Sequence, residues 1–447
     1  MLLLNYTTMK KITLSVLSLM FAAAPVMANT AENPSEKPSV SEAEISSTLS
    51  TPAESGSVVL SSTSSASATA SSVSSPVEEK KEGPKFKFSP TGLVLVDAAV
   101  YGPDGDGFND GMSLPDIRLG GKATFGNWLA KVDIGFAKAK VGLKDVYVQY
   151  NFENTHNLLR AGYFVHQFGL NAATSSAFKP SGESATSDDF FKATGRNLGI
   201  QFILDIPQWF VGVSGMADGS YVSGTMEKAG RPSIGAIGRF VWRPLMETGK
   251  VVQIGVSPWY QSPLHSTEAL GDGHTRQTDS YFNFSANFPT RVASVSLLGT
   301  GEISDAKGLF KVTPELLLCY DRFALESQYY FMNVARRDNP SYQAHGVYGL
   351  LRGLIFGDKA YNYSHGDAGL ALPGPKTLEC VLGYNYTDGN KNGIRAGITN
   401  DFSVTFNYYI NKYFLARLAW HYTDVRNSSV MFDRHVNMVQ VRLQAKF

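Results

Sequence analysis

The chain has 447 residues and a formal net charge of +1, so its bulk charge gives no reason to expect nucleic acid or an acidic partner. Aromatic residues make up 12%, and 42 residues are glycine, with Tyr and Phe far more numerous than Trp. This composition suits many strands with one apolar face each better than helical membrane spans. With only two cysteines, Cys319 and Cys380, a small disulfide framework is excluded.

The N-terminus has the features of a secretory signal peptide. Lys10 and Lys11 precede an apolar stretch over residues 12–27, and small residues around Ala28 suit a cleavage site. A membrane anchor is the alternative, but the stretch is shorter than the about 20 residues that a spanning helix requires. We therefore expect residues 1–28 to be a signal peptide.

Residues 29–84 form a second region, rich in Ser, Thr, Ala, Glu and Pro and almost without aromatic residues. Such a segment buries too little surface to offset the entropy of ordering it. The composition predicts a disordered periplasmic linker. A tether to peptidoglycan or to a partner is the alternative.

From Lys85 onward the dominant pattern is strict alternation of apolar and polar residues, which predicts β-strands. In residues 402–410 one face carries Phe402, Val404, Phe406, Tyr408 and Ile410. After a tight turn at residues 411–412, the next face carries Phe414, Ala416, Leu418, Trp420 and Tyr422. Similar runs occupy residues 128–136, 144–150, 158–166, 233–243, 310–320, 323–332, 377–386 and 439–447.

These strands predict an all-β fold, a transmembrane antiparallel barrel over residues 85–447. The runs have the 9–11 residues of a tilted transmembrane strand, short turns alternate with long polar loops, and aromatic residues lie near strand ends. Only a closed barrel or a helix satisfies all backbone groups in lipid. We expect 16 strands, within a range of 16–18, because residues 291–302 and 342–356 fit either a strand or a loop. That number encloses a water-filled lumen.

The polar faces then line the lumen, and a channel needs charge at a narrow point rather than a catalytic set. By parity, the cationic candidates are Arg118, Lys122, Lys131, Arg160, Arg239, Arg243, Arg417 and Arg442. Acidic residues share these faces: Asp116, Asp133, Asp145, Glu315, Glu326 and Glu379. The alternative to a selectivity role is a field of mixed charges that braces the wall.

The loop over residues 167–193 is the first long connection, and we expect it to form the constriction. It is rich in Ser, Ala and Gly, and Lys179, Lys192 and Arg196 lie in or beside it. The alternative is an exposed surface loop. The last strand ends at Phe447, which resembles the C-terminal signal read by the barrel-assembly machinery, an expected partner during biogenesis.

The region from Phe86 to Phe447 resembles the phosphate-selective porins O and P. The pieces that carry the resemblance are Leu143–Tyr150, Gly162–Phe164, Arg196–Gly199, Leu378–Tyr384, Asn400–Phe402, Phe406–Tyr409 and Val441–Phe447. The resemblance implies a 16-stranded barrel, a homotrimer, an inward-folded third loop and passive uptake of anions such as phosphate. The matching pieces are mostly framework, so the family's arginine ladder cannot be placed residue by residue.

Together these observations predict a porin of the bacterial outer membrane, in contact with the lipid bilayer and lipopolysaccharide, that passes small solutes with a preference for anions. The alternatives are a channel for other solutes such as sugars, which stack on lumenal rings such as Tyr147 and Tyr409, and a surface adhesin with long loops, for instance residues 361–375. No cofactor and no enzyme motif is expected. Asp104, Asp106 and Asp110 form a weak candidate Ca²⁺ site, because hard cations prefer clustered oxygens.

Overall fold

The computed structural model describes residues 85–102, 107–137, 141–191, 195–218, 233–269 and 275–447. The predicted signal peptide and linker therefore lie outside the described residues, as do Asp104, Asp106 and Lys192. None of the helices in the described ranges is both long and apolar enough to cross a membrane.

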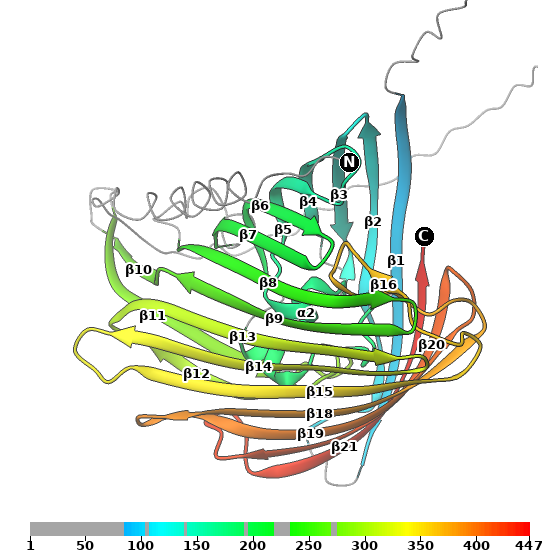
Figure 1. Ribbon diagram of the computed structural model, residues 1–447. Coiled ribbons are helices and arrows are strands. Elements are labelled where there is room, and N and C mark those ends of the chain that lie inside the picture. Colours follow the sequence, from blue (N-terminus) through cyan, green and yellow to red (C-terminus); the bar gives the residue numbers. More distant parts are fainter. Residues whose placement is uncertain (1–84, 103–106, 138–140, 192–194, 219–232, 270–274) are drawn as a thin grey trace, which may run out of the picture. The chain divides into compact units, whose positions relative to one another are not determined.

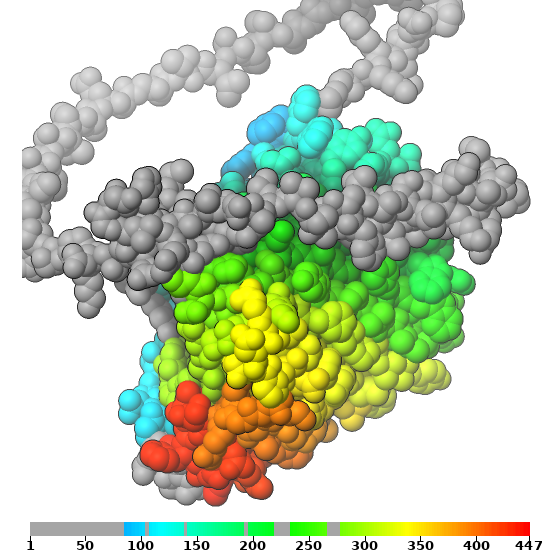
Figure 2. All heavy atoms as spheres, turned by 90° about the vertical axis from the view of Figure 1, so that its left-hand side faces the viewer, coloured from blue at the N-terminus to red at the C-terminus, as the bar shows by residue number. Residues whose placement is uncertain are grey.

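Sixteen strands form one closed antiparallel barrel in chain order (Figure 1). They are β1 (Phe86–Tyr101), β2 (Gly111–Phe125), β3 (Trp128–Gly135), β4 (Gly142–Asn151), β5 (Leu158–Val165), β6 (Arg196–Ile206), β7 (Trp209–Ala217), β8 (Ile234–Glu247), β9 (Lys250–Gln261), β13 (Ala306–Tyr320), β14 (Phe323–Arg336), β15 (Tyr342–Phe356), β18 (Thr377–Lys391), β19 (Ile394–Tyr409), β20 (Phe414–Arg426) and β21 (Arg434–Lys446). The sixteen-stranded barrel predicted from alternation is confirmed. In space-filling form the successive strands make adjacent bands, green, yellow, orange and red (Figure 2).

The barrel closes where the last strand pairs with the first. β21 runs antiparallel to β1 over the register from Leu93 opposite Lys446 to Tyr101 opposite Met438. Beyond this ladder, Phe447 and Gly92 exchange backbone hydrogen bonds of 2.9 and 3.1 Å. The final residue is therefore part of the seam, which leaves no unpaired edge in lipid.

The two faces of each strand are divided as the alternation predicts. On β19, Phe402 and Phe406 are exposed on the outer face, whereas Thr405 and Asn407 are buried on the inner face. The two cysteines follow the same rule: Cys319 is buried on the inner face of β13, and Cys380 of β18 lies between the buried inner-face residues Glu379 and Val381. Both thiols are free, in agreement with their positions on opposite faces of the wall.

The two segments that fit either a strand or a loop from the sequence differ in the structure. Residues 342–356 form the wall strand β15. Residues 291–302 belong instead to the long connection between β9 and β13, which carries a separate three-stranded sheet of β10 (Leu264–Ala269), β11 (Thr275–Asn287) and β12 (Ser296–Ile303). Because this connection has strands of its own, the alternation of residues alone predicts more wall strands here than the barrel contains.

Turn chemistry distinguishes the two ends of the barrel. Because the strands alternate in direction, one set of connections lies at the end of the barrel where β1 begins and β21 ends. These are the connections after β2, β4, β6, β8, β13, β15 and β19. Most of them are short, as is typical of the periplasmic end. At the opposite end, the tight β18–β19 hairpin turns on Asn392 and Gly393, whose φ angles of 50° and 84° fit a type I′ turn.

One connection at the periplasmic end is long. Residues 357–376 join β15 to β18 and contain the two-stranded ribbon β16 (Tyr363–Ser364) and β17 (Gly369–Leu370). Tyr361 and Ala368 within it are buried. Residues 361–375, considered as a surface loop from the sequence, therefore do not form an exposed loop, because their side chains and carbonyls pair with the inner wall.

Candidate functional site: the constriction and the lumenal charges

The described residues of the connection between β5 and β6, 166–191 and 195, lie inside the barrel. They include two short helices, α2 (Gly169–Ala173) and α3 (Thr186–Phe190). We call this segment the constriction loop, after the role expected of it from the sequence. Its backbone and side chains bond to polar groups of the inner wall: Gly169 N donates to Ser257 Oγ (3.0 Å), and Asn385 Nδ2 donates to Ser187 Oγ (2.6 Å). Polar residues on the inner face of the wall thus replace water around this loop.

Aromatic side chains fix the same loop against the wall. Phe168, Phe190 and Phe191 are fully buried. The ring of Phe191 stacks on Tyr330 of β14 with centroids 5.3 Å apart, and the Tyr330 hydroxyl donates to Asp188 Oδ1 (2.9 Å). This part of the loop therefore packs tightly against β14 on the inner side of the barrel.

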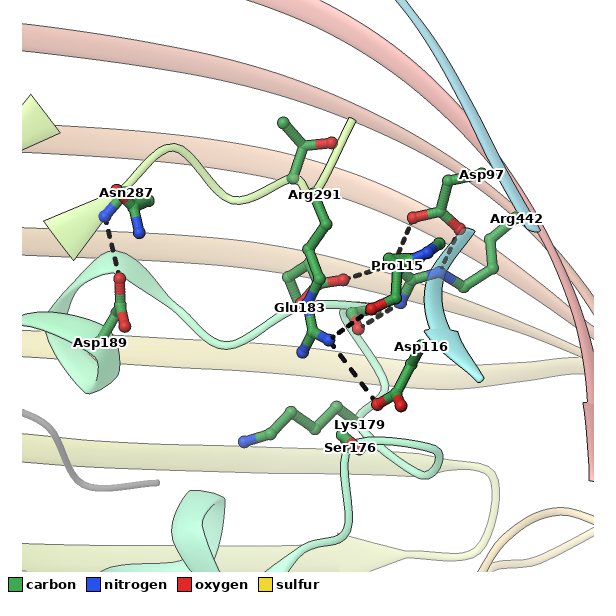
Figure 3. Close-up of polar contacts among 12 residues, drawn as sticks. Asp97, Pro115, Asp116, Ser176, Lys179, Glu183, Asp189, Asn287, Arg291 and Arg442 are labelled. Atoms are coloured by element: carbon green, nitrogen blue, oxygen red, sulfur yellow. Dashed lines mark hydrogen bonds and ion pairs between the residues drawn. The ribbon is translucent and has the colours of Figure 1, made fainter. Parts of the chain in front are cut away.

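A second segment meets the constriction loop from the connection between β9 and β13. Arg291 Nε donates to Glu183 Oε2 (3.1 Å), and Asn287 N donates to Asp189 Oδ2 (2.9 Å). Glu183 also accepts from Arg442 Nη2 of β21. Figure 3 shows Glu183 between the guanidinium groups of Arg291 and Arg442. This carboxylate joins two inward segments to the seam of the barrel.

The electrostatics of Glu183 follow from this position. Burial alone would raise the pKa of its carboxyl group, but Arg291 and Arg442 outweigh burial and hold that pKa below its ordinary value. Lys179, in the same loop, shows the opposite balance: burial lowers its pKa, although Asp188 opposes the change. Lys179 Nζ donates to the carbonyl of Asn171 (2.9 Å), so it anchors the loop internally.

Arg239 of β8 holds the periplasmic segment, residues 357–376, inside the barrel. Its guanidinium group donates to Glu315 (2.8 and 3.1 Å), to the carbonyls of Asp367 (2.6 Å) and Ala368 (3.0 Å), and to Gln167 Oε1 (3.1 Å). Arg239 is fully buried. It therefore links the wall, the constriction loop and the periplasmic segment, and has no donor free for a solute.

The other predicted cations point inward, and most of them bind wall carboxylates. Arg118 Nε donates to Asp116 (2.9 Å), and Lys131 contacts both Asp133 (2.7 Å) and Asp145 (2.8 Å). Asp145 also contacts Arg196 (2.8 Å). In the same way Arg243 pairs with Asp205, and Arg442 with Asp97 and Glu183. The predicted acidic residues are thus partners of the cations, which is the mixed-charge field that we considered as an alternative.

Three of the predicted cations have no carboxylate within ion-pair distance among the described residues: Lys122, Arg160 and Arg417. Arg160 Nε and Nη2 donate to Gln149 Oε1 (2.9 and 2.7 Å), and its guanidinium carbon lies 4.4 Å from the centre of the Tyr147 ring. Lys122 of β2 lies opposite Lys131 of β3 in the register. Arg417 is buried, Arg160 is half-buried and Lys122 is exposed.

Lys446 joins these cations, although it was not among the selected candidates. It lies on the lumenal face of β21, opposite Leu93 of β1, which in turn lies opposite Arg118 of β2. Lys122, Lys131, the carboxylate of Asp367 and Arg118 are its electrostatic neighbours. Its ammonium lies 3.2 Å from the centre of the Phe178 ring in the constriction loop. Parity in the last strand places Lys446 on the lumenal face, so this signal was available from the sequence.

Other lumenal cations were not selected from the sequence, although Lys311 shares one face of residues 310–320 with the selected Glu315. Arg352 lies on β15, the segment with an ambiguous pattern, and contacts Glu379 (2.9 Å). Arg291 lies in a connection without alternation, so parity could not place it. Lys311, on the inner face of β13, lies 3.5 Å from the centre of the Trp259 ring and donates to the carbonyl of Phe191 (2.8 Å). All three help to hold inward segments or wall residues in place.

The weak Ca²⁺ candidate is described only in part, because Asp104 and Asp106 lie outside the described residues. Asp110 accepts a hydrogen bond from the backbone N–H of Tyr101 (2.8 Å), as expected of an aspartate in a polar hairpin loop. Within the described part of the chain, no group of three or more His, Cys, Asp or Glu side chains is placed to hold a metal ion.

A closed sixteen-stranded barrel with an inward loop and a charged lumen defines a porin of the bacterial outer membrane. The family model of the phosphate-selective porins O and P matches residues 94–447, and the chain belongs to this family. It is a channel-forming barrel of the bacterial outer membrane. No curated protein sequence matches the chain.

Solved porins resemble the fold at very low sequence identity. An anion-selective porin from Comamonas acidovorans superposes with a TM-score of 0.50 at 11% identity, covering 81% of this chain and 100% of that chain. A loop L8 deletion mutant of OmpT, an outer membrane protein of Vibrio cholerae, has a TM-score of 0.50 at 10% identity, with 81% and 99% covered. The trimer form of in-vitro folded OmpT reaches 0.50 at 9% identity, with 82% and 100% covered.

Proposed function

We propose that this porin is a passive diffusion channel with a preference for small anions, phosphate among them. The observation that carries the proposal is the group formed by Lys122, Arg160 and Lys446, three lumenal cations that bind no carboxylate among the described residues. We call it the free-cation group. An ion pair presents little net field to a passing solute, whereas an unpaired cation in a narrow lumen attracts anions.

The chemistry of the free-cation group fits phosphate as well as chloride. A guanidinium offers paired, charge-assisted hydrogen bonds that match the oxygens of phosphate. Arg160 is held in place by Gln149 and Tyr147, so little ordering entropy is lost when an anion arrives. Lys122 and Lys446 add point charges without the planar fork of arginine, which favour rapid entry and release over tight binding.

The sugar alternative finds less support in the lumen. Stacking of a sugar needs a free ring face, but Arg160 lies over Tyr147 and Lys446 lies over Phe178. Tyr409 is buried, and its hydroxyl donates to Glu379 Oε2 (2.8 Å). The rings of Tyr147 and Phe178 are therefore covered by cations and do not offer these faces to a sugar. The tether alternative depends on residues 29–84, which lie outside the described residues.

Reversal potentials in planar bilayers under a KCl gradient test the proposal. The native channel is expected to be anion-selective, and Lys122→Gln, Arg160→Gln and Lys446→Gln are each expected to lower the ratio of chloride to potassium permeability, with the largest loss in the triple variant. Lys412→Gln, in an exposed periplasmic turn, is the matched control and should leave the ratio unchanged. Cation preference in the native channel would overturn the proposal.

A homotrimer is proposed as the assembly, on the basis of family membership and of the trimer form reported for OmpT. Light scattering with detergent correction, on protein extracted without heating, distinguishes a trimer from a monomer. A monomer at every protein concentration would contradict this assignment without affecting the selectivity proposal.

A further inference from the structure

The periplasmic segment carries an acidic residue into the barrel at the turn between its two short strands. Asp367 lies in this turn, between β16 and β17. Arg239 of the wall donates to the carbonyls of Asp367 (2.6 Å) and Ala368 (3.0 Å). Gln167 of the constriction loop donates to the carbonyl of Gly366 (3.3 Å). The turn is therefore held through its backbone, which leaves the side chain of Asp367 available for another role.

The carboxylate of Asp367 is unpaired. It has neither a hydrogen bond nor an ion pair with another residue in the described part of the chain, and the residue is half-buried. The acidic residues of the inner wall differ in this respect, since Asp116, Asp145 and Glu315 all form ion pairs with lumenal cations. A paired carboxylate presents little net field, whereas an unpaired one acts on the charges around it and on passing solutes.

Packing places this turn beside the strand that carries Arg160. Ala368 is fully buried in an apolar cluster, and Leu158 of β5 packs against the same cluster. Leu158 and Arg160 are two positions apart on β5, so their side chains share its lumenal face. The ring of His365, in the same turn, stacks on that of His156 just before β5, with centroids 4.5 Å apart. Two separate contacts thus hold the turn against this strand.

The electrostatic neighbours of the Asp367 carboxylate are cations from three parts of the wall. Burial raises the pKa of its carboxyl group, and Arg239, Arg160 and Lys446 oppose this rise. Arg239 already has an ion pair with Glu315. Arg160 and Lys446 belong to the free-cation group, and neither is within ion-pair distance of the carboxylate. The carboxylate therefore acts on these two cations from a distance and does not occupy their donors.

We infer that Asp367 is a selectivity-determining residue, whose carboxylate acts as a built-in counter-charge to Arg160 and Lys446. This inference rests on the proposed anion preference of the free-cation group. A fixed negative charge beside the two cations repels an anion that has reached them, so it weakens binding and speeds release. Conduction requires this balance, because binding must favour entry and still permit exit.

Replacing the carboxylate by an amide tests the inference directly. Asp367→Asn removes the charge and keeps the backbone carbonyl that Arg239 binds. In planar bilayers at pH 7, this variant should have a higher ratio of chloride to potassium permeability than the native channel. Phosphate should block its chloride current at a several-fold lower concentration, because release is slower. Asp367→Glu keeps the charge and should stay close to the native channel in both measurements.

Asp338→Asn is the matched control for the change in net charge. Asp338 is exposed in the turn between β14 and β15, at the end of the barrel away from the periplasmic segment, and its replacement should leave both quantities unchanged. If the native channel is anion-selective and Asp367→Asn behaves as Asp338→Asn does, the inference is overturned and the proposed function stands. Cation preference in the native channel would overturn the proposed function, and this inference with it.

A second comparison distinguishes a counter-charge from a purely structural role. If the carboxylate acts on an anion bound at Arg160, the gain in phosphate block from Asp367→Asn should be smaller in the Arg160→Gln background than in the native channel. The unfolding temperatures of the native protein and Asp367→Asn should agree within about 2 °C, because no described side-chain contact is lost. An equal gain in both backgrounds, or a much lower unfolding temperature of Asp367→Asn, overturns the inference.

Discussion

Arg239 and Glu315 form a forked ion pair on the inner wall of the barrel, with Nη2–Oε1 and Nε–Oε2 distances of 2.8 and 3.1 Å and both side chains fully buried. The same guanidinium group binds the constriction loop through Gln167 and the periplasmic segment through two carbonyls. Two inward segments that enter from opposite ends thus meet on one arginine. The donors of Arg239 all bind groups that hold the fold together, so this residue is not part of the free-cation group.

Replacing Arg239 should therefore change stability and pore size more than selectivity. Arg239→Gln leaves Glu315 buried without its cation, a change that typically costs about 3–5 kcal/mol. We expect a lower unfolding temperature and a larger single-channel conductance, because the periplasmic segment loses its anchor. Heat-modifiable gel mobility and bilayer recordings measure the two effects. A permeability ratio that falls as far as in Lys122→Gln would contradict the structural role of Arg239.

Glu183 accepts from both Arg291 and Arg442, an arrangement that we call the Glu183 clamp. It predicts that the stability of the folded protein falls in acid. The pKa of Glu183 is lowered in the folded protein, so its stabilising contribution is complete above its ordinary value of about 4.3 and is lost as the pH falls through the lowered value. Native protein should lose stability in acid faster than Glu183→Gln does. The variant should also be less stable at neutral pH, by about 2–4 kcal/mol, and show noisier conductance. Denaturant titrations from pH 7 down to about pH 2 compare them; parallel pH profiles of the two proteins would exclude the clamp.

Arg160→Lys separates charge from geometry in the free-cation group. Lysine keeps the positive charge but lacks the planar fork that matches phosphate oxygens and the stacking face against Tyr147. Chloride selectivity should be almost unchanged, whereas the block of chloride current by added phosphate should weaken several-fold. Dose–response curves for phosphate in symmetric KCl measure this. Equal phosphate block in both proteins would show that only net charge matters at Arg160.

The two cysteines should remain unpaired and differ in reactivity. Cys319 is buried on the lumenal face of β13, and Cys380 lies on the opposite face of β18. Reducing agents should leave the unfolding temperature unchanged. An apolar maleimide should label Cys380 of the folded barrel in detergent faster than Cys319, as read by mass spectrometry of peptides. Preferential labelling of Cys319, or a gel shift on reduction, would contradict the face assignment.

Much of the fold was accessible from local pattern. Alternation over residues 402–410 placed Asn407 inward and Phe406 outward, because the period of two is a property of the strand itself. The same argument placed Arg417 and Arg442 on the lumenal face of neighbouring strands. It could not separate a wall strand from an excursion of similar composition, so residues 291–302 and 342–356 had to be resolved by the tertiary structure.

The sequence by itself determined the barrel and the lumenal face of each strand, and it indicated one of the segments that enter the lumen, because these follow from alternation and connection length. Only the tertiary structure decided which lumenal cations are free. Arg442 finds Glu183, 259 positions away, and Arg239 finds the carbonyls of Asp367 and Ala368, whereas Lys122 and Arg160 find no carboxylate among the described residues. Such pairings depend on strand register and on inward segments from both ends, which bring together groups that no local pattern relates.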